Sequence, residues 1–305
     1  MIARLEHLRR HPAVFRHLTG LALDLFDELA ADLLPAWRAA ERARLTRPGR
    51  RRAVGAGHPF ALAFADQLLL TVVWLRHYPT QEVLGYLFGA SDTAALRAIG
   101  RCLPLLEQAG RDTMRLPDPG KGGRKSLPRL LADTPGLAVI VDTFEQRVQR
   151  PKRRQRSYYS GKQKRHTLKS QVTVDEEGDI ADVAESRPGP WADLKVLRRS
   201  GLRRKLPRGV GALGDQAYQG LARWHPEGLG ATPRRKPRGR PRRPQDRAYN
   251  RAFARRRIVV EHAIGRLRRY QALTQMDRHH RRQHTARVRA VAGLVNRQRR
   301  HRRAA

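Results

Sequence analysis

Apolar residues recur at helical spacing in the first third of the chain. One such set is Leu21, Leu25, Leu29 and Leu33. These residues fall on one face of a helix, because positions four apart lie one above the other along its axis. A second apolar set runs from Leu68 to Leu75 and predicts another buried helix. The chain is therefore expected to be helical to about Pro117.

Beyond residue 136 the pattern changes to that of strands. Residues 137–141 form a continuous apolar run, which is typical of a central strand buried on both faces. Residues 167–174 alternate toward a turn at Gly178, and residues 180–185 predict the returning strand of a hairpin. Residues 210–213 predict a fourth, short strand.

Helical spacing returns in two later segments, residues 192–199 and residues 246–270. The second is the longer, and its apolar face consists of Val260, Ala263, Ile264 and Leu267. The order of three strands, a helix, a strand, a loop and a helix predicts an α/β domain after the helical one.

These patterns divide the chain into consecutive parts. We expect a helical domain, a basic Gly/Pro-rich linker, an α/β domain and a basic tail. Their bounds are 1–116, 117–136, 137–296 and 297–305. An arginine- and proline-rich stretch at 233–244 is expected to be an exposed loop, since it has too few apolar residues to pack.

The charge is strongly unbalanced, with 64 Lys and Arg against 27 Asp and Glu, a formal net charge of +37. A GC-rich genome explains arginine in place of lysine, but it supplies acidic residues as well and leaves the excess unexplained. A surplus of this size calls for a polyanionic partner, and nucleic acid is the commonest.

Other classes of protein are disfavoured by what the sequence lacks. It has no run of about 18 apolar residues and no signal-peptide pattern, so we expect that the protein neither spans a membrane nor is secreted. We therefore expect it to be cytoplasmic. Its single cysteine, Cys102, excludes an internal disulfide framework and a cysteine-based zinc site. The glycines and lysines at 120–126 lack the spacing of a phosphate-binding loop and indicate a basic linker.

Three acidic residues stand at special points of the predicted elements. Asp142 ends the apolar strand, Asp215 follows the fourth strand, and Glu261 lies mid-helix among arginines. Open α/β sheets place their sites at the carboxyl ends of strands, so the three are expected to converge. Carboxylates drawn together repel one another, and we expect the pKa of Asp142 or Asp215 to be raised.

Carboxylate oxygens are the ligands that Mg²⁺ prefers, and two such ions can serve phosphodiester cleavage. Each acid taken alone has a structural interpretation, since a strand-end Asp often caps a turn. Glu261 could likewise pair with Arg257 or Arg268.

The acids also stand within recognisable motifs. The motifs are Asp142-Thr143-Phe144-Glu145, Arg150-Pro151, residues 158–162, residues 164–167, residues 188–193, residues 215–220, Asn250 and residues 257–268. Together they resemble the catalytic motifs of DDE transposases of the IS4/IS5 insertion-sequence group. The resemblance implies an RNase H-like mixed sheet with helices on both faces. It also implies that Asp142, Asp215 and Glu261 bind two Mg²⁺ ions, with Mn²⁺ able to substitute.

Asp193 lies in one of these motifs and is the reserve candidate, although capping of the following helix is the simpler account. Arg257 and Arg268 share the helical stripe of Glu261 and are expected to hold DNA phosphates, unless they pair with Glu261 itself.

The helical domain carries a second resemblance, at about residues 66–115, to the helix-turn-helix that precedes the catalytic domain in this group. From the residues alone, Thr80 caps a short helix and Gly89 makes the turn. Ser91 then caps a second helix. That helix is expected to present Thr93, Arg97 and Arg101 to DNA.

The sequence thus predicts a bacterial, nucleoid-associated transposase. It would bind the terminal inverted repeats of its element, cut and rejoin DNA with Mg²⁺, and act on element ends and target DNA as a homo-oligomer. Two alternatives remain: a non-catalytic, transposase-derived DNA-binding protein, and a general basic nucleic-acid-binding protein.

Overall fold

The structure is a computed structural model, and it describes residues 3–46, 48–49, 51, 53, 60–118 and 138–304. The chain forms two compact units. Unit 1 comprises Met1–Asp112, Arg269–Leu273 and Arg289–Ala305, and unit 2 comprises Thr113–Arg268 and Thr274–Val288. The predicted linker, from residue 119 onward, and the 120–126 segment lie outside the described residues.

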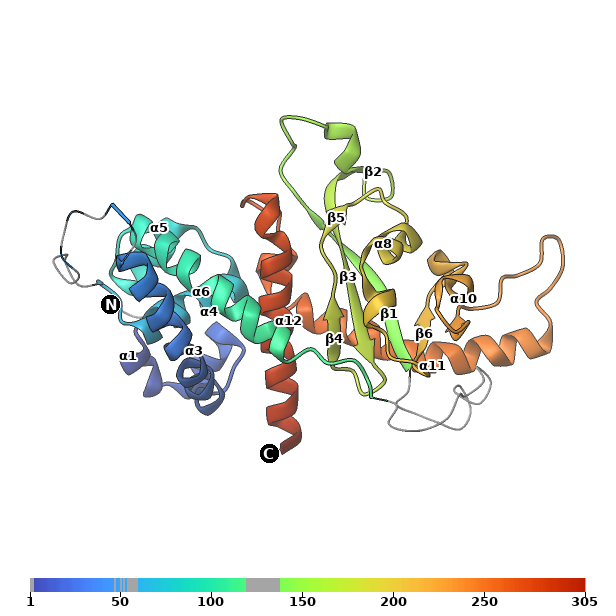
Figure 1. The fold of residues 1–305 in the computed structure, drawn as a ribbon, viewed down its shortest axis with the longest axis horizontal. Helices are drawn as coiled ribbons and strands as arrows, with labels where there is room; N and C mark the ends of the chain where they lie inside the picture. The colour runs from blue at the N-terminus through green and yellow to red at the C-terminus, as the bar shows by residue number, and fades with distance from the viewer. Residues whose placement is uncertain are drawn as a thin grey trace. The chain divides into compact units, whose positions relative to one another are not determined.

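Unit 1 is helical, as predicted (Figure 1). Its elements are α1 (Leu5–Arg9), α2 (Pro12–Thr19), α3 (Leu23–Leu45), α4 (Phe64–His77), α5 (Gln81–Phe88), α6 (Asp92–Asp112), η3 (Gln271–Leu273) and most of α12 (His284–Ala304). The apolar set at 21–33 is buried in and just before α3, and the set at 68–75 is buried in α4. Within the described ranges, no helix is both long and apolar enough to cross a membrane.

The helix-turn-helix has the predicted caps. The Thr80 hydroxyl accepts from Val83 N at 3.3 Å, which caps α5. Gly89 follows α5 with a φ of +58°, a left-handed conformation that glycine adopts without steric cost. The Ser91 hydroxyl accepts from Ala94 N at 3.1 Å in the first turn of α6. Side-chain caps and a glycine turn therefore define both helices, as the sequence indicates.

Helix α12 corrects the expectation of a basic tail. Residues 297–304 continue the helix that begins at His284, and its apolar residues 288–295 are buried. Two of the basic side chains pair with acids of α3: Arg297 with Asp32 at 2.9 Å, and His301 with Asp24 at 2.8 Å. The acidic partners lie more than 260 positions away in sequence, so local composition alone suggested a tail.

Two glycines allow α6 and α12 to cross closely. A Cβ added to Gly110 would lie closer than 3.0 Å to the backbone of Arg289, and one added to Gly293 equally close to the backbone of Gly110. Beside the crossing, Glu107 accepts from Arg289 at 3.1 Å. Glycine is therefore required at both positions, since any side chain would separate the two helices.

Unit 2 is built on a mixed sheet whose main path is β2-β3-β1-β6-β7. The strands are β1 (Ala138–Arg147), β2 (Tyr159–Ser160), β3 (Arg165–Asp175), β4 (Ile180–Val183), β5 (Arg187–Pro188), β6 (Gly211–Gly214) and β7 (Gly230–Ala231). β1 is the predicted central strand, antiparallel to β3 and parallel to β6. The predicted hairpin is β3 with β4, and the predicted fourth strand is β6.

Helices cover both faces of this sheet (Figure 1). They are α8 (Asp193–Arg199), α9 (Leu202–Lys205), α10 (Leu221–Trp224) and α11 (Pro244–Leu267), with short 3-10 turns η1 (Gln155–Tyr158), η2 (Gln216–Tyr218) and η4 (Arg281–Gln283). Val139 and Val141 pack against residues of α8, α9 and α10. Side chains alternate along a strand, and α11 packs against β1 and β3 on the opposite face. The α/β prediction is confirmed.

We expect Gly110→Ala to destabilise the protein by roughly 1–3 kcal/mol, because the new methyl group would force the α6 and α12 backbones apart. Gly100→Ala, in the same helix, is the matched control, since a Cβ there meets no atom within 4 Å. Alanine is a better helix former than glycine, so the control should gain up to about 1 kcal/mol. Thermal melts of both variants measure the difference, and equal melting temperatures would contradict the crossing.

Candidate functional site

Two of the predicted acids lie beside each other on neighbouring parallel strands. β1 and β6 pair from Ala138 with Gly211 to Val141 with Gly214, so the next residues are Asp142 and Asp215. Asp215 is the N-cap residue of η2, and its carboxylate accepts from Ala217 N at 2.9 Å. Asp142, however, does not end its strand: β1 continues to Arg147 along β3. The strand end that matters is that of β6, which stops beside Asp142.

Burial raises the pKa of Asp142 above its usual range, and the charge of Asp215 adds to the effect. The Thr143 N–H, which donates to Asp142 at 2.7 Å, and the guanidinium of Arg257 act in the opposite direction. The expected direction of the pKa shift is confirmed, but its main cause is loss of hydration and only secondarily repulsion between the two acids.

Glu261 is linked to this pair through an arginine. Arg257 donates to Asp142 at 3.2 Å from one nitrogen and to Glu261, one turn further along α11, from another. The Glu261 side chain is 53% exposed. Of the two pairs that the sequence left open for Glu261, the one with Arg257 is therefore present. Within the part of the chain that the structure describes, no group of three or more His, Cys, Asp or Glu side chains is arranged to hold a metal ion.

A second polar cluster lies on the other face of β1. Lys169 of β3 is buried and donates to Asp193 at 2.7 Å, and it lies 3.6 Å from Glu145. Thr143 also donates to Asp193, at 2.8 Å. The interpretation of Asp193 as a helix cap was wrong: it is the first residue of α8, the cap position is Ala192, and its carboxylate neutralises a buried lysine.

Lys169 was not among the residues predicted from the sequence, although a signal was present. A lysine within a strand that is otherwise buried needs an anionic partner, since an unpaired buried charge is costly. The β1–β3 register places Glu145 opposite Lys169 and supplies that partner.

The hydroxyl of Tyr218 lies close enough to Asp142, Asp193 and Asp215 for the charges of all three to affect its pKa. Its ring is fully buried, and a Cβ on Gly214 would lie 2.8 Å from it, so only glycine leaves room for the ring before Asp215. Burial raises its pKa well above 10.0, and the charges of Asp142, Asp193 and Asp215 raise it further. Within the described residues its hydroxyl has no hydrogen-bond partner. Asp142 and Asp215 beside it supply carboxylate oxygens, the type of ligand that a hard divalent cation prefers.

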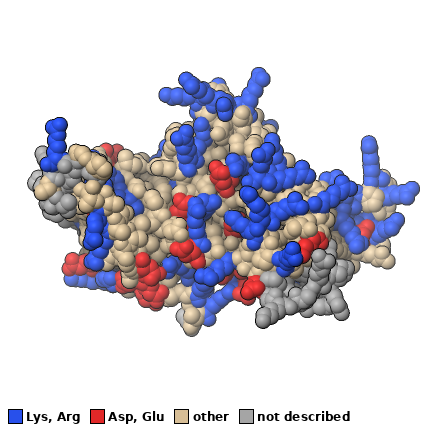
Figure 2. All heavy atoms as spheres, in the orientation of Figure 1, with Lys and Arg blue, Asp and Glu red and all other residues tan. Residues whose placement is uncertain are grey.

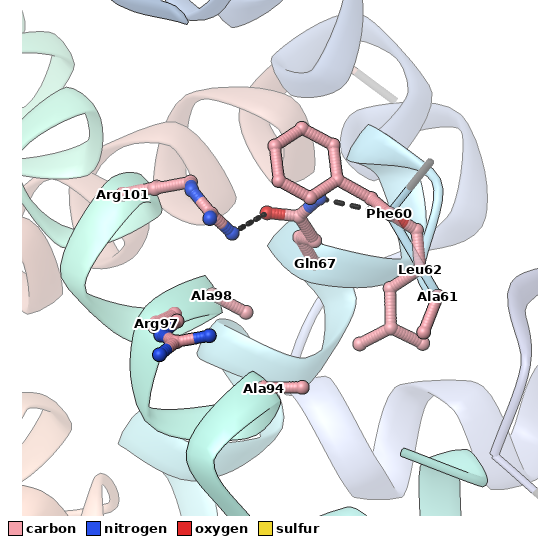
Figure 3. Close-up of a pocket in the computed structure, with 8 residues that line it drawn as sticks. All are labelled: Phe60, Ala61, Leu62, Gln67, Ala94, Arg97, Ala98 and Arg101. Atoms are coloured by element: carbon pink, nitrogen blue, oxygen red, sulfur yellow. Dashed lines mark hydrogen bonds between the residues drawn. The ribbon is translucent and has the colours of Figure 1, made fainter. Parts of the chain in front are cut away.

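The helix-turn-helix presents its predicted contact residues unequally. Thr93 and Arg97 of α6 are exposed. Arg101 is half-buried: its guanidinium lies over the Phe60 ring, 4.3 Å from the centroid, and donates to Gln67 at 3.4 Å (Figure 3). Arg97, Arg101, Phe60 and Gln67 line a pocket of about 260 Å³. Arg101 is thus engaged inside unit 1, which the sequence could not show because its partners precede it by more than 30 positions.

The predicted basic loop is exposed as expected, and one end of it is held in place. The Asn250 side chain accepts from Arg234 N at 2.8 Å and donates to Arg234 O at 3.0 Å. Arg234 also pairs with Asp246 at 2.7 Å and lies over the Tyr249 ring. The remaining arginines of the loop are largely exposed, and Lys and Arg side chains are prominent at this end of unit 2 in Figure 2. Arg268, just beyond the other end of α11, is exposed as well.

A helical unit with a helix-turn-helix, joined to a basic α/β unit with two adjoining aspartates, has the organisation of an enzyme that works on DNA. Comparison with known families agrees. Residues 141–296 match the model described as DDE superfamily endonuclease, and residues 60–112 match the helix-turn-helix of DDE superfamily endonuclease. The first match covers half of the chain, which therefore belongs to the DDE superfamily endonucleases.

One curated relative extends over nearly the whole chain. It is described as a probable transposase for insertion sequence element IS702, from Microchaete diplosiphon. The two proteins are 27% identical over 282 residues, which is 92% of this chain and 93% of the relative. No solved structure matches significantly.

We expect Asp142→Asn to raise the melting temperature at pH 7 in the presence of EDTA. When folding raises the pKa of a carboxyl, its ionisation at a pH above that pKa destabilises the folded protein. The neutral amide of asparagine does not ionise and removes this destabilisation. The gain should shrink as the pH falls and vanish well below 3.8, the ordinary pKa, because there the carboxyl is protonated in both folded and unfolded chains.

Asp27→Asn is the control for this measurement, because Asp27 forms an exposed pair with Arg9 and contributes little. A lower melting temperature for Asp142→Asn than for wild type at pH 7 would refute the account.

Proposed function

We propose that the protein is a transposase of the IS4/IS5 group, which binds the terminal inverted repeats of its insertion sequence and cuts and rejoins DNA with Mg²⁺. The observation that carries the proposal is the adjacency of Asp142 on β1 and Asp215 directly after β6, together with Arg257, which pairs with both Asp142 and Glu261. The name of the relative, which extends over both units, supports it.

The sheet supports an RNase H-like class for unit 2. Its central strand β1 has an antiparallel hairpin on one side and the parallel strands β6 and β7 on the other, with helices on both faces. In this proposal Asp142 and Asp215 hold divalent metal, Mn²⁺ being able to replace Mg²⁺, and Glu261 completes the ligand set. When bound, such ions activate the attacking oxygen and stabilise the leaving oxygen of an in-line displacement.

Arg257 has a place in this mechanism besides that of a DNA contact. It neutralises Asp142 and Glu261 in the protein alone, and its fork-shaped guanidinium is equally suited to a phosphate. We propose that Arg257 exchanges these carboxylates for the DNA backbone when the substrate binds. Arg268, which is exposed beyond the end of the same helix and about 16 Å along its axis from Arg257, would hold a phosphate several nucleotides further along the DNA.

The helix-turn-helix would recognise the element ends, through Thr93 and Arg97 of α6. Arg101 would support that helix from within unit 1 instead of contacting bases. We further propose that the protein works as a homo-oligomer, because an element has two ends and each needs a catalytic site.

We expect Asp142→Asn, Asp215→Asn and Glu261→Gln to lower cleavage of a duplex carrying the element end by roughly 10³-fold or more, in Mg²⁺ and in Mn²⁺. Several kcal/mol of transition-state stabilisation depend on the ligands, and each 1.36 kcal/mol is about tenfold in rate. Binding should be largely retained. Asp27→Asn is the control, since Asp27 forms an exposed pair with Arg9 in unit 1.

A variant that still cuts would remove its residue from the site. Wild-type protein that binds the element end but cuts nothing in either metal would instead indicate the non-catalytic, transposase-derived DNA-binding protein.

We expect Arg97→Ala to weaken binding to the element end by about 1–3 kcal/mol relative to random DNA, with no change in melting temperature. Arg101→Ala should instead lower the melting temperature, because its interactions with Phe60 and Gln67 are removed. Binding titrations and thermal melts of both variants separate the two roles. Loss of discrimination in a fully stable Arg101→Ala variant would restore Arg101 as a DNA contact.

A further inference from the structure

An arginine-lined hollow of about 590 Å³ lies on unit 2 among α8, α9 and α10. It is separate from the carboxylates, the 233–244 loop and the helix-turn-helix. Its lining residues are Arg198, Arg199, Gly201, Arg203, Arg204, Arg223 and Trp224. Lys and Arg side chains gather over this part of the surface in Figure 2. The hollow therefore combines a defined shape with a strong positive charge.

The backbone under these arginines is fixed by the core. Leu197 of α8, Leu202 of α9 and Trp224 of α10 are buried in the cluster that packs on Val139 and Val141 of β1. Each arginine of the hollow is exposed and lies one or two positions in sequence from Leu197, Leu202 or Trp224. The guanidinium groups therefore project from a rigid base on three short helices.

Within the described ranges, none of the arginines of the hollow forms an ion pair or a side-chain hydrogen bond with another residue, so no acidic side chain there balances their charge. Lys205, their neighbour in α9, differs because it donates to Asp182 at 2.7 Å. Several like charges held together without a counter-charge repel one another, and a bound polyanion would remove this repulsion.

We infer that this hollow binds the sugar-phosphate backbone of the DNA on which the enzyme acts, a few base pairs from the cleaved bond. The inference rests on the proposed function. Asp193, at the first turn of α8, is bonded to Thr143 beside Asp142, whereas Arg199 ends the same helix. Six residue steps of a helix span about 9 Å, and phosphates of one strand recur about every 3.4 Å along the duplex axis.

The geometry favours an extended backbone over a single small anion. The arginines are exposed and come from three separate helices around an open hollow, and a single phosphate has too few oxygens to pair with all of their guanidinium forks. A DNA strand presents successive phosphates, each of which suits the planar guanidinium fork. Such contacts hold the duplex in register without selecting a sequence.

The test replaces one arginine on each helix, as Arg199→Ala, Arg203→Ala and Arg223→Ala together, in the full chain. Binding to a fluorescent random-sequence duplex is titrated at several salt concentrations. The slope of log K against log salt should fall in magnitude by about 0.9 for each phosphate that is no longer neutralised, and by about 2–3 in all. Lysine at the same positions should restore most of the slope, since it keeps the charge.

The matched control is Arg10→Ala, Arg16→Ala and Arg38→Ala, which removes the same net charge from exposed sites in unit 1. Its slope should stay within about 0.5 of wild type, which is less than the value of about 0.9 for one phosphate. An unchanged slope in the hollow variant, or an equal fall in the control, would overturn the inference.

Wild-type protein gives a second readout that depends on no variant. Phenylglyoxal modifies accessible arginines, and mass spectrometry identifies the modified sites. The duplex should protect the arginines of the hollow but not Arg10, Arg16 or Arg38, and inorganic phosphate at equal ionic strength should not protect them. Protection by phosphate alone, or none by DNA, would refute a backbone site. Failure of the proposed function would appear separately, as wild-type protein that binds the element end but cuts it in neither Mg²⁺ nor Mn²⁺.

Discussion

Arg257 makes the interaction on which the rest of unit 2 depends. It reaches from α11 to β1 and joins the largely buried Asp142 to the exposed Glu261. Asp142 lies where hydration is lost and beside a second acid, so ionisation there is costly unless a cation is near. The arginine provides that cation and also ties the long helix to the sheet. The same contact therefore stabilises the resting protein and holds two acids of the predicted triad close to one position.

Much of this architecture could be predicted from periodicity and local capping. Strands β1, β3, β4 and β6, helix α11 and the caps of α5 and α6 all have signals within a few residues of themselves. The second half of β1 has no such local signal, because Thr143 and Glu145 on its inner face are polar. Thr143 donates to Asp193, the partner of the buried Lys169, and Glu145 lies near Lys169 itself. A hydrophobic pattern does not reveal a strand whose interior is ionic.

The candidate site shows the same limit. The types and positions of Asp142, Asp215 and Glu261 pointed to one location, yet the partners of individual side chains come from far along the chain. Asp193 meets Lys169 of β3, and Arg101 meets Phe60 and Gln67. In both cases the residue was singled out from the sequence, but its partner was set by tertiary packing that no local pattern encodes.

The crossing of α6 and α12 at Gly110 and Gly293 has a consequence for how the protein is made. Unit 1 contains the helix-turn-helix, but residues 289–304 of its core follow the entire α/β unit in sequence. During translation, the N-terminal helices of unit 1 are synthesised first, whereas their packing partner α12 is synthesised last. Unit 1, which contains the helix-turn-helix, is therefore completed only after unit 2 has been translated, so a prematurely terminated chain lacks a finished unit 1.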